Sequence, residues 1–161
     1  MDIPTKEECG ELLNQNKTPS NVIRHSIAVT EFAEELCDQL LENNADINKD
    51  QIIASCMLHD IERVQPDHVT AGAKLLSKLG FPEIGKIIQK HGLHRIGEEE
   101  FYPKTYEEKI VFYADKRVVE DKVVTLTERF KYLRERYKKD FLEDIKIAKK
   151  IEEEIMELIK K

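Results

Sequence analysis

Residues 55–76 read SCMLHDIERVQPDHVTAGAKLL and contain the feature on which the interpretation of the whole chain depends. Cys56 and Met57 have the apolar spacing of a helix that packs against a core, yet His59 and Asp60 follow them directly. Burying a carboxylate is costly unless a cation neutralises it, and neutral imidazole is the commonest side-chain ligand of metal ions. The pair therefore indicates a metal site at an inward-facing helix.

The composition predicts a helical globular protein. The chain has 161 residues, a typical single-domain length, and only 7% of them are aromatic, with no Trp among them. The net charge of -6 argues against general attraction to nucleic acid or to anionic membranes. No apolar segment has the length of a membrane span, and the first ten residues do not resemble a signal peptide, so we expect a cytoplasmic protein.

Helix signals recur along the chain. Capping boxes at Thr5/Glu8 and Thr105/Glu108 predict two helix starts. Apolar spacing and stop residues predict a short first helix, helices over about 19–43, 50–66, 67–79 and 82–91, and three more starting near 105, 126 and 142. We therefore expect an all-α single domain over 1–161, with a core over about 18–129 and C-terminal packing helices over about 126–161.

The three cysteines do not indicate a disulfide framework or a zinc site. Cys9, Cys37 and Cys56 are odd in number, widely spaced and without a CxxC pair. We interpret them as buried thiols, because free cysteine behaves as a small apolar residue.

Four of the five histidines fall on successive predicted helices, at or near their inward faces: His25, His59, His68 and His91. One inward histidine is typical of a hydrogen-bonded core residue. Here there are four, and Asp60 and Asp115 lie on helices that should pack together with them. Buried carboxylates need a cation, and imidazoles bind metal ions, so the combination indicates a metal site.

Four segments of the chain carry a family resemblance: HSIAVTEFAEEL, LHDIERV, HVTAGAKLL and VFYADK. Their order and the positions of their histidines and aspartates resemble the HD-domain superfamily of metal-dependent phosphohydrolases, over about residues 22–129. The resemblance implies a helical bundle with a metal-dependent hydrolytic site.

The resemblance also implies a ligand set. The residues that match the ligands of the first metal are His25, His59, Asp60 and Asp115. Asp60 is expected to bridge to a second ion, His68 and His91 match the additional ligands of dinuclear members, and His94 could complete that set. We therefore favour two ions. Mixed carboxylate and imidazole ligands suit Mn, Fe, Co or Ni, and the sequence does not choose among them.

Two adjacent ions would activate a bridging water and hold phosphoryl oxygens, so no side-chain nucleophile is required. Asp60 is then the central catalytic carboxylate. Arg63 is the first candidate for binding substrate phosphate, because a guanidinium group matches phosphate oxygens, although a surface arginine at a helix end is the alternative. Arg95 and Lys116 are weaker substrate-binding candidates, chosen for their closeness to ligands.

Three functions remain open at this point. The first is a hydrolase of a small, nucleotide-like phosphomonoester or phosphodiester. HD proteins with the same ligands also activate oxygen, so the second is a di-iron oxygenase. The third is a non-catalytic, metal-containing nucleotide sensor or interaction module. Cleavage of cyclic di-GMP is not expected, because the GYP motif of that branch is missing from HGLHRIGEEEF at residues 91–101.

Residues 129–139, RFKYLRERYKK, interleave basic and aromatic side chains. They could form an RNA-binding face. We favour an amphipathic helix with Phe130, Leu133 and Tyr137 inward and the charges in solvent, and we do not expect a nucleic-acid partner. The last helix is interpreted as a packing helix, which leaves a homodimer open.

Overall fold

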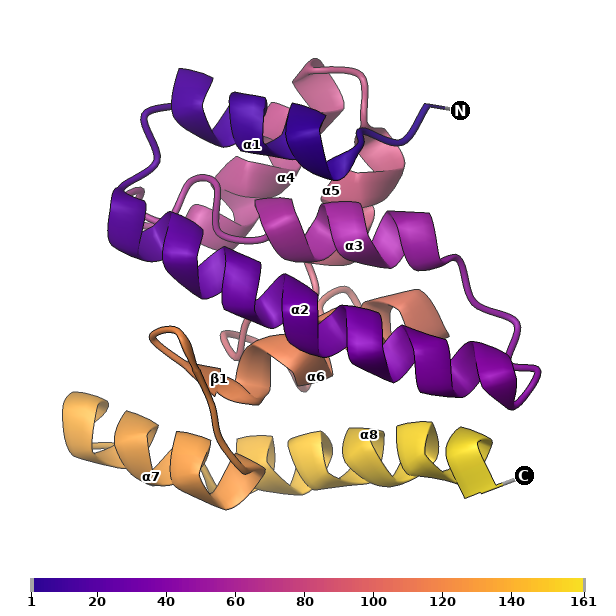
Figure 1. The fold of residues 1–161 in the computed structure, drawn as a ribbon. Helices are drawn as coiled ribbons and strands as arrows, with labels where there is room; N and C mark the ends of the chain where they lie inside the picture. The colour runs from indigo at the N-terminus through magenta and orange to yellow at the C-terminus, as the bar shows by residue number, and fades with distance from the viewer. Residues whose placement is uncertain (1, 161) are drawn as a thin grey trace.

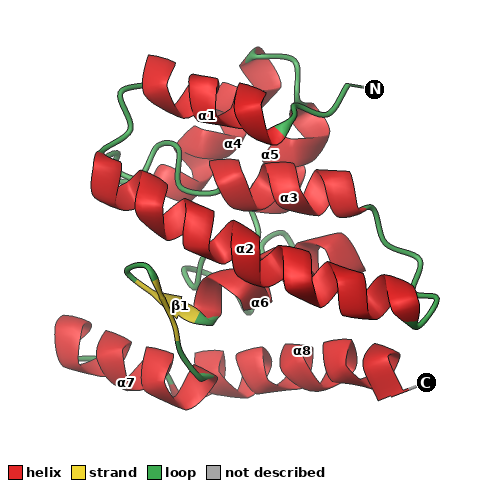
Figure 2. Ribbon diagram, in the orientation of Figure 1, coloured by secondary structure: helices red, strands yellow, loops and turns green. Residues whose placement is uncertain are grey.

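The computed structural model describes residues 2–160, and it confirms the all-α prediction (Figure 1). The helices are α1 (Lys6–Gln15), α2 (Ser20–Glu42), α3 (Lys49–Leu58), α4 (His68–Lys78), α5 (Pro82–Ile88), α6 (Tyr106–Lys116), α7 (Leu126–Tyr137) and α8 (Leu142–Lys160). Within residues 2–160 the one sheet is an antiparallel hairpin of β1 (Val118–Val119) and β2 (Lys122–Val123), which the sequence analysis did not anticipate (Figure 2).

Helix α3 lies between two hydrophobic cores. Its Cys56 belongs to the larger core, which joins α2, α3 and α6 with α7 and α8. Its Met57 and Leu58 belong to the smaller core, formed with α1, α4 and α5. Figure 1 shows the same arrangement, with α1, α4 and α5 on one side of α3 and α6 to α8 on the other. The end of α3 is therefore fixed from both sides. The predicted division into a core and C-terminal packing helices stays a prediction.

Two helices end earlier than the sequence pattern predicted. Helix α3 ends at Leu58 instead of near Pro66, and α5 ends at Ile88 instead of at His91. In both places a histidine satisfies a carbonyl at the helix end, because its Nδ1–H donates to the carbonyl three residues earlier: His59 to Cys56 at 2.7 Å and His91 to Ile88 at 2.6 Å. Side chains that satisfy the last carbonyls are a common way to end a helix.

The turns that follow α3 are held by the α1–α2 connection. The carbonyl of Ile61 accepts hydrogen bonds from Asn16 Nδ2 at 3.1 Å and from Thr18 Oγ1 at 3.2 Å. These bonds satisfy a backbone oxygen that no helix partner would otherwise reach. The segment that carries Asp60 and Arg63 is therefore fixed although it is not helical.

The inward assignment of Tyr137 was wrong. Phe130 and Leu133 are buried as predicted, but Tyr137 is 51% exposed. The chain leaves the helix there, with Lys138 in the left-handed region at φ 54°. The buried residue that follows is Phe141, whose ring centroid lies 6.4 Å from that of Phe130. In residues 2–160 no helix is long and apolar enough to cross a bilayer.

Candidate metal centre

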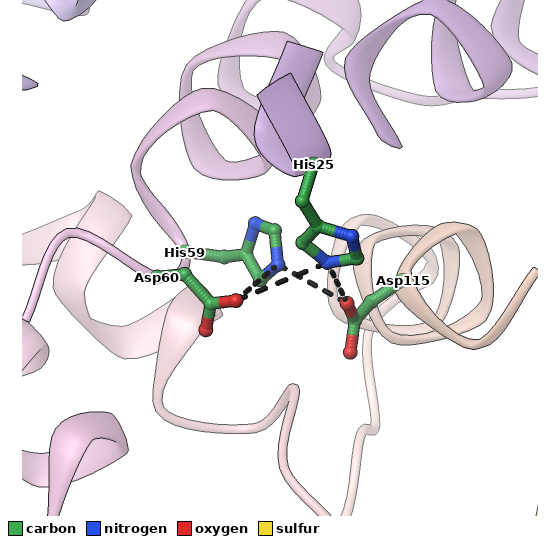
Figure 3. A group of neighbouring side chains, drawn as sticks. All are labelled: His25, His59, Asp60 and Asp115. Atoms are coloured by element: carbon green, nitrogen blue, oxygen red, sulfur yellow. Dashed lines mark hydrogen bonds and ion pairs between the residues drawn. The ribbon is translucent and has the colours of Figure 1, made fainter. Parts of the chain in front are cut away.

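Four side chains from separate parts of the chain converge on one point (Figure 3): His25 from α2, His59 and Asp60 from the end of α3, and Asp115 from α6. Each offers one nitrogen or oxygen atom, and these atoms all lie within 4.8 Å of one another. They include all four residues of the predicted first-metal set, and three of the four side chains are buried. Their roles as ligands stay a prediction.

Asp115 and Asp60 approach the two imidazoles from different sides. Oδ1 of Asp115 lies 2.9 Å from Nε2 of His25 and 3.1 Å from Nε2 of His59. Oδ2 of Asp60 lies 3.4 Å from Nε2 of His59 and 3.9 Å from Nε2 of His25. Figure 3 shows these contacts as dashed lines between the four side chains. Two nitrogens and two oxygens therefore face a common centre.

The imidazole rings have the orientation that a metal site requires. Nδ1 of His25 lies 2.7 Å from the backbone carbonyl of Glu120, and Nδ1 of His59 lies 2.7 Å from that of Cys56. A carbonyl oxygen only accepts, so each Nδ1 donates its hydrogen there, and Nε2 is the nitrogen that faces the cluster and is placed to bind an ion. Such backbone contacts orient metal-binding histidines in proteins. The residues therefore fit a divalent transition metal.

A second cluster shares Asp60 with the first. Oδ1 of Asp60 lies 3.3 Å from Nε2 of His91 and 3.7 Å from Nε2 of His68, which begins α4. Nδ1 of His91 donates to the carbonyl of Ile88, so Nε2 is the ring nitrogen that faces the carboxylate. The arrangement provides donors for a second ion beside the first. The number and identity of the ions stay a prediction.

The two buried carboxylates of the cluster, Asp60 and Asp115, need positive charge nearby. Burial raises the pKa of both carboxyls, but His59 and His91 beside Asp60, and Lys116 and His59 beside Asp115, hold each pKa below its usual range. Burial lowers the pKa of His59, but the two carboxylates outweigh it and raise that pKa to about 9. Two buried carboxylates are stable only with a cation close by, which a divalent ion would supply.

The centre opens into a cavity of about 1270 Å³. His25, Asp60, His68, His91 and Asp115 form one part of its wall, and residues from α7 and from the start of α8 form another. Typical small-molecule sites have volumes of about 300–1,000 Å³, so there is room for a nucleotide-sized compound next to the ligands.

The comparisons with known proteins agree with this geometry. The family model of the HD domain matches residues 22–155. The chain belongs to the HD-domain family. No solved structure matches it significantly.

Curated relatives of this HD domain include proteins of different names. A tRNA (cytidine(56)-2'-O)-methyltransferase of Picrophilus torridus is 30% identical over 95% of this chain and 47% of its own length. A dihydroneopterin 2',3'-cyclic phosphate phosphodiesterase of Methanocaldococcus jannaschii is 32% identical over 68% of this chain and 51% of its own length. An uncharacterised protein of that organism is 30% identical over 78% of this chain and 83% of its own. The chain thus spans about half the length of the two relatives with named activities.

Arg63 and His94 lie on the cavity wall of the HD domain, outside the ligand clusters. Arg63 is exposed just beyond Asp60, where its guanidinium can reach into the cavity. The structure does not bring His94 into either cluster, contrary to the expectation that it could complete the second set. Its side chain is exposed, because the chain continues in turns after His91 and carries it towards solvent.

The two weaker substrate-binding candidates already have protein partners. The Arg95 guanidinium pairs with Glu98, with Nε 2.6 Å from Oε2, and covers the ring of Phe101. The buried Lys116 ammonium donates to the carbonyl of His91 at 2.8 Å and to Oδ2 of Asp115. Lys116 is thus placed to orient the carboxylate of Asp115, and its role in binding substrate stays a prediction.

The sequence analysis missed two contributors to the site. One is the backbone carbonyl of Glu120, in the left-handed turn of the β1–β2 hairpin, which orients His25. A backbone carbonyl leaves no signal in a sequence. The other is Arg129, which lines the cavity from α7. It begins the basic and aromatic stretch, whose periodicity does not show that this side of the helix borders the metal centre.

Proposed function

We propose that this HD-domain protein is a metal-dependent phosphohydrolase that cleaves a small, nucleotide-like phosphoester with an activated water. The observation that carries the proposal is the pair of donor clusters joined by Asp60 at the wall of one large cavity. Two divalent ions bound there would lower the pKa of a shared water and stabilise the charge on a phosphoryl group.

The residues of the chain have separate roles in this proposal. Asp60 contributes one carboxylate oxygen to each cluster and so fixes the spacing between them. His25, His59 and His91 are oriented by backbone carbonyls and therefore need little rearrangement on binding an ion. Arg63 is free to contact phosphate oxygens, since its exposed guanidinium has no ion-pair or hydrogen-bond partner within residues 2–160.

A phosphodiester is the favoured bond type. The named activity of the Methanocaldococcus jannaschii relative, at 32% identity, is cleavage of a 2',3'-cyclic phosphate. That relative supports a phosphodiester attached to a heterocyclic compound as the substrate class. The methyltransferase relative is longer, and the chain spans 47% of it, so methyl transfer is no part of the proposal.

The test begins with metal analysis of protein purified without chelator. The protein is then loaded with Mn, Fe, Co, Ni or Mg and assayed against phosphomonoesters, linear phosphodiesters and 2',3'-cyclic nucleotides. We expect metal-dependent release of a phosphomonoester or phosphate, and its loss in Asp60→Ala. Inactivity of the fully loaded protein against all three classes would favour a non-catalytic sensor. Oxygen consumption with iron bound would indicate the oxygenase instead.

A further inference from the structure

One face of α7 borders the cavity opposite the metal centre and has no assigned role. Arg129, Tyr132, Arg136 and Tyr137 all line the cavity. The first three positions are three or four residues apart along the helix, so their side chains share one side of it. This is the same basic and aromatic stretch for which the sequence left two interpretations open.

Arg129 is a partly buried cation without an acidic partner among residues 2–160. Its Nη1 donates to the carbonyl of Val118 at 2.7 Å, which holds the guanidinium just beyond the end of α6. Its Nε is buried and has no hydrogen-bond partner in this part of the chain. By contrast, Arg95 pairs with Glu98 and Lys116 with Asp115. A guanidinium that lines a cavity and has no counter-ion among the described residues is placed to pair with an anionic ligand.

The two tyrosines of this face both contact Arg136. Tyr137 is 51% exposed, and the guanidinium carbon of Arg136 lies 5.5 Å from the centre of its ring. Nη1 of Arg136 in turn donates to the hydroxyl of Tyr132 at 2.8 Å. These contacts fix a planar cation beside an exposed ring. Planar heterocyclic bases stack on such surfaces by ring stacking and cation–π attraction.

We propose that the cavity face of α7 is the substrate-recognition surface, on which Arg129 binds the phosphoryl group and Tyr137 stacks on the heterocyclic base of a nucleoside phosphoester. The inference rests on the proposed function and narrows its substrate class. It excludes simple sugar phosphates as preferred substrates, because they have no planar heterocyclic ring to stack on Tyr137.

The experiment measures binding with ligands that cannot be hydrolysed. Dissociation constants of metal-loaded protein are determined for methylphosphonate and for the phosphonate analogue of adenosine monophosphate. The wild type should bind the adenosine compound more tightly. Arg129→Gln should weaken both ligands by about tenfold or more, because a hydrogen bond to a charged group is lost. Tyr137→Leu should weaken only the adenosine compound, by about tenfold.

Lys131→Gln is the matched control, since it removes a positive charge from the exposed side of the same helix. Equal binding by Arg129→Gln and Lys131→Gln would overturn the role of Arg129. An unchanged preference for the adenosine compound in Tyr137→Leu would overturn the stacking. If Arg129→Gln does not fold, Arg129→Lys serves instead: it should weaken both ligands severalfold, and binding equal to wild type contradicts the inference.

The two proposals fail in different ways. Ligand binding that depends on Arg129 and Tyr137, in a protein that hydrolyses no phosphoester, refutes the proposed function and retains the recognition surface. If Arg129→Gln and Tyr137→Leu hydrolyse phosphoesters as fast as the wild type and bind both ligands as tightly, only the recognition surface is refuted.

Discussion

Oδ1 of Asp60 lies 3.3 Å from Nε2 of His91, whereas the other carboxylate oxygen of Asp60 faces His59 at 3.4 Å. One side chain therefore belongs to both donor clusters, while each histidine belongs to one. Substitutions at Asp60 and at the histidines should have different effects on metal content.

The first prediction concerns metal content. Asp60→Ala should lose metal from both clusters and abolish hydrolysis. His68→Ala and His91→Ala should lose only the second ion, and so keep about half of the metal and little activity. Inductively coupled plasma mass spectrometry of each purified variant measures the outcome.

His94→Ala is the matched control for these histidines, because it removes an imidazole from the cavity wall outside both clusters. It should retain the full metal content. Full activity of His68→Ala and His91→Ala with a single ion bound would refute a dinuclear mechanism and leave these histidines as orienting or substrate-contacting groups.

The second prediction separates substrate binding from metal binding at Arg63. Arg63→Ala should leave metal content unchanged and lower kcat/KM by about tenfold or more, through the loss of a charge-assisted hydrogen bond to phosphate. Steady-state kinetics and metal analysis of one preparation provide the test. A lower metal content in this variant would mean that the guanidinium supports the metal centre itself.

The third prediction concerns metal removal. The proposed ligands come from α2, the end of α3 and α6, so an ion should bind the folded chain and stabilise it. An ion at one hundred times its dissociation constant adds about 2.7 kcal/mol to the free energy of unfolding. Chelation should therefore lower the melting temperature by several degrees, as measured by circular dichroism. An unchanged melting temperature after proven metal removal would argue against a site in the core.

The fourth prediction concerns alkaline pH. Burial raises the pKa of Cys37 to about 12 and that of Cys9 likewise, from an ordinary value of 9.0. The folded protein thus holds these protons more tightly than the unfolded chain does. Their contribution to stability is complete below pH 9 and is lost as the pH rises towards 12. Cys37→Ala should therefore show a smaller drop in melting temperature between pH 9 and pH 11 than wild type; parallel curves would contradict this.

The fifth prediction concerns the packing of α4 on α5, the helices that bring His68 and His91 together. A methyl group at Gly85 would lie 2.8 Å from the carbonyl oxygen of Ala73. Gly85→Ala should therefore destabilise the fold by about 1–3 kcal/mol, measured by urea unfolding. Gly10→Ala in α1 is the control: a methyl group there meets no atom within 4 Å and should stabilise the helix by up to about 1 kcal/mol.

The sequence predicted the helices and the residues that converge, because both leave local signals. Thr105 and Glu108 mark the start of α6 by a capping box, which the structure contains. His25, His59, Asp60 and Asp115 were grouped by their order and by the motifs around them, and the structure brings them together.

Other features depended on contacts that apolar spacing does not reveal. The end of α3 at Leu58 is associated with the bond between the His59 ring and the Cys56 carbonyl, and apolar spacing alone continued the helix. Tyr137 has the spacing of an inward residue, but the left-handed turn at Lys138 redirects the chain and Phe141 is buried instead. The position of Arg129 beside the cavity follows from how α7 packs, which periodicity does not specify.

The separation of the proposed ligands along the chain has a consequence for folding kinetics. His25 and Asp115 are 90 residues apart, so their donor atoms meet only after α2 and α6 have docked. A chelating centre of this kind forms late, since the entropy of closing so long a loop must be lost first. Bound metal should then leave the refolding rate almost unchanged and slow the unfolding rate. The ion would therefore prolong the lifetime of the native state without accelerating its formation.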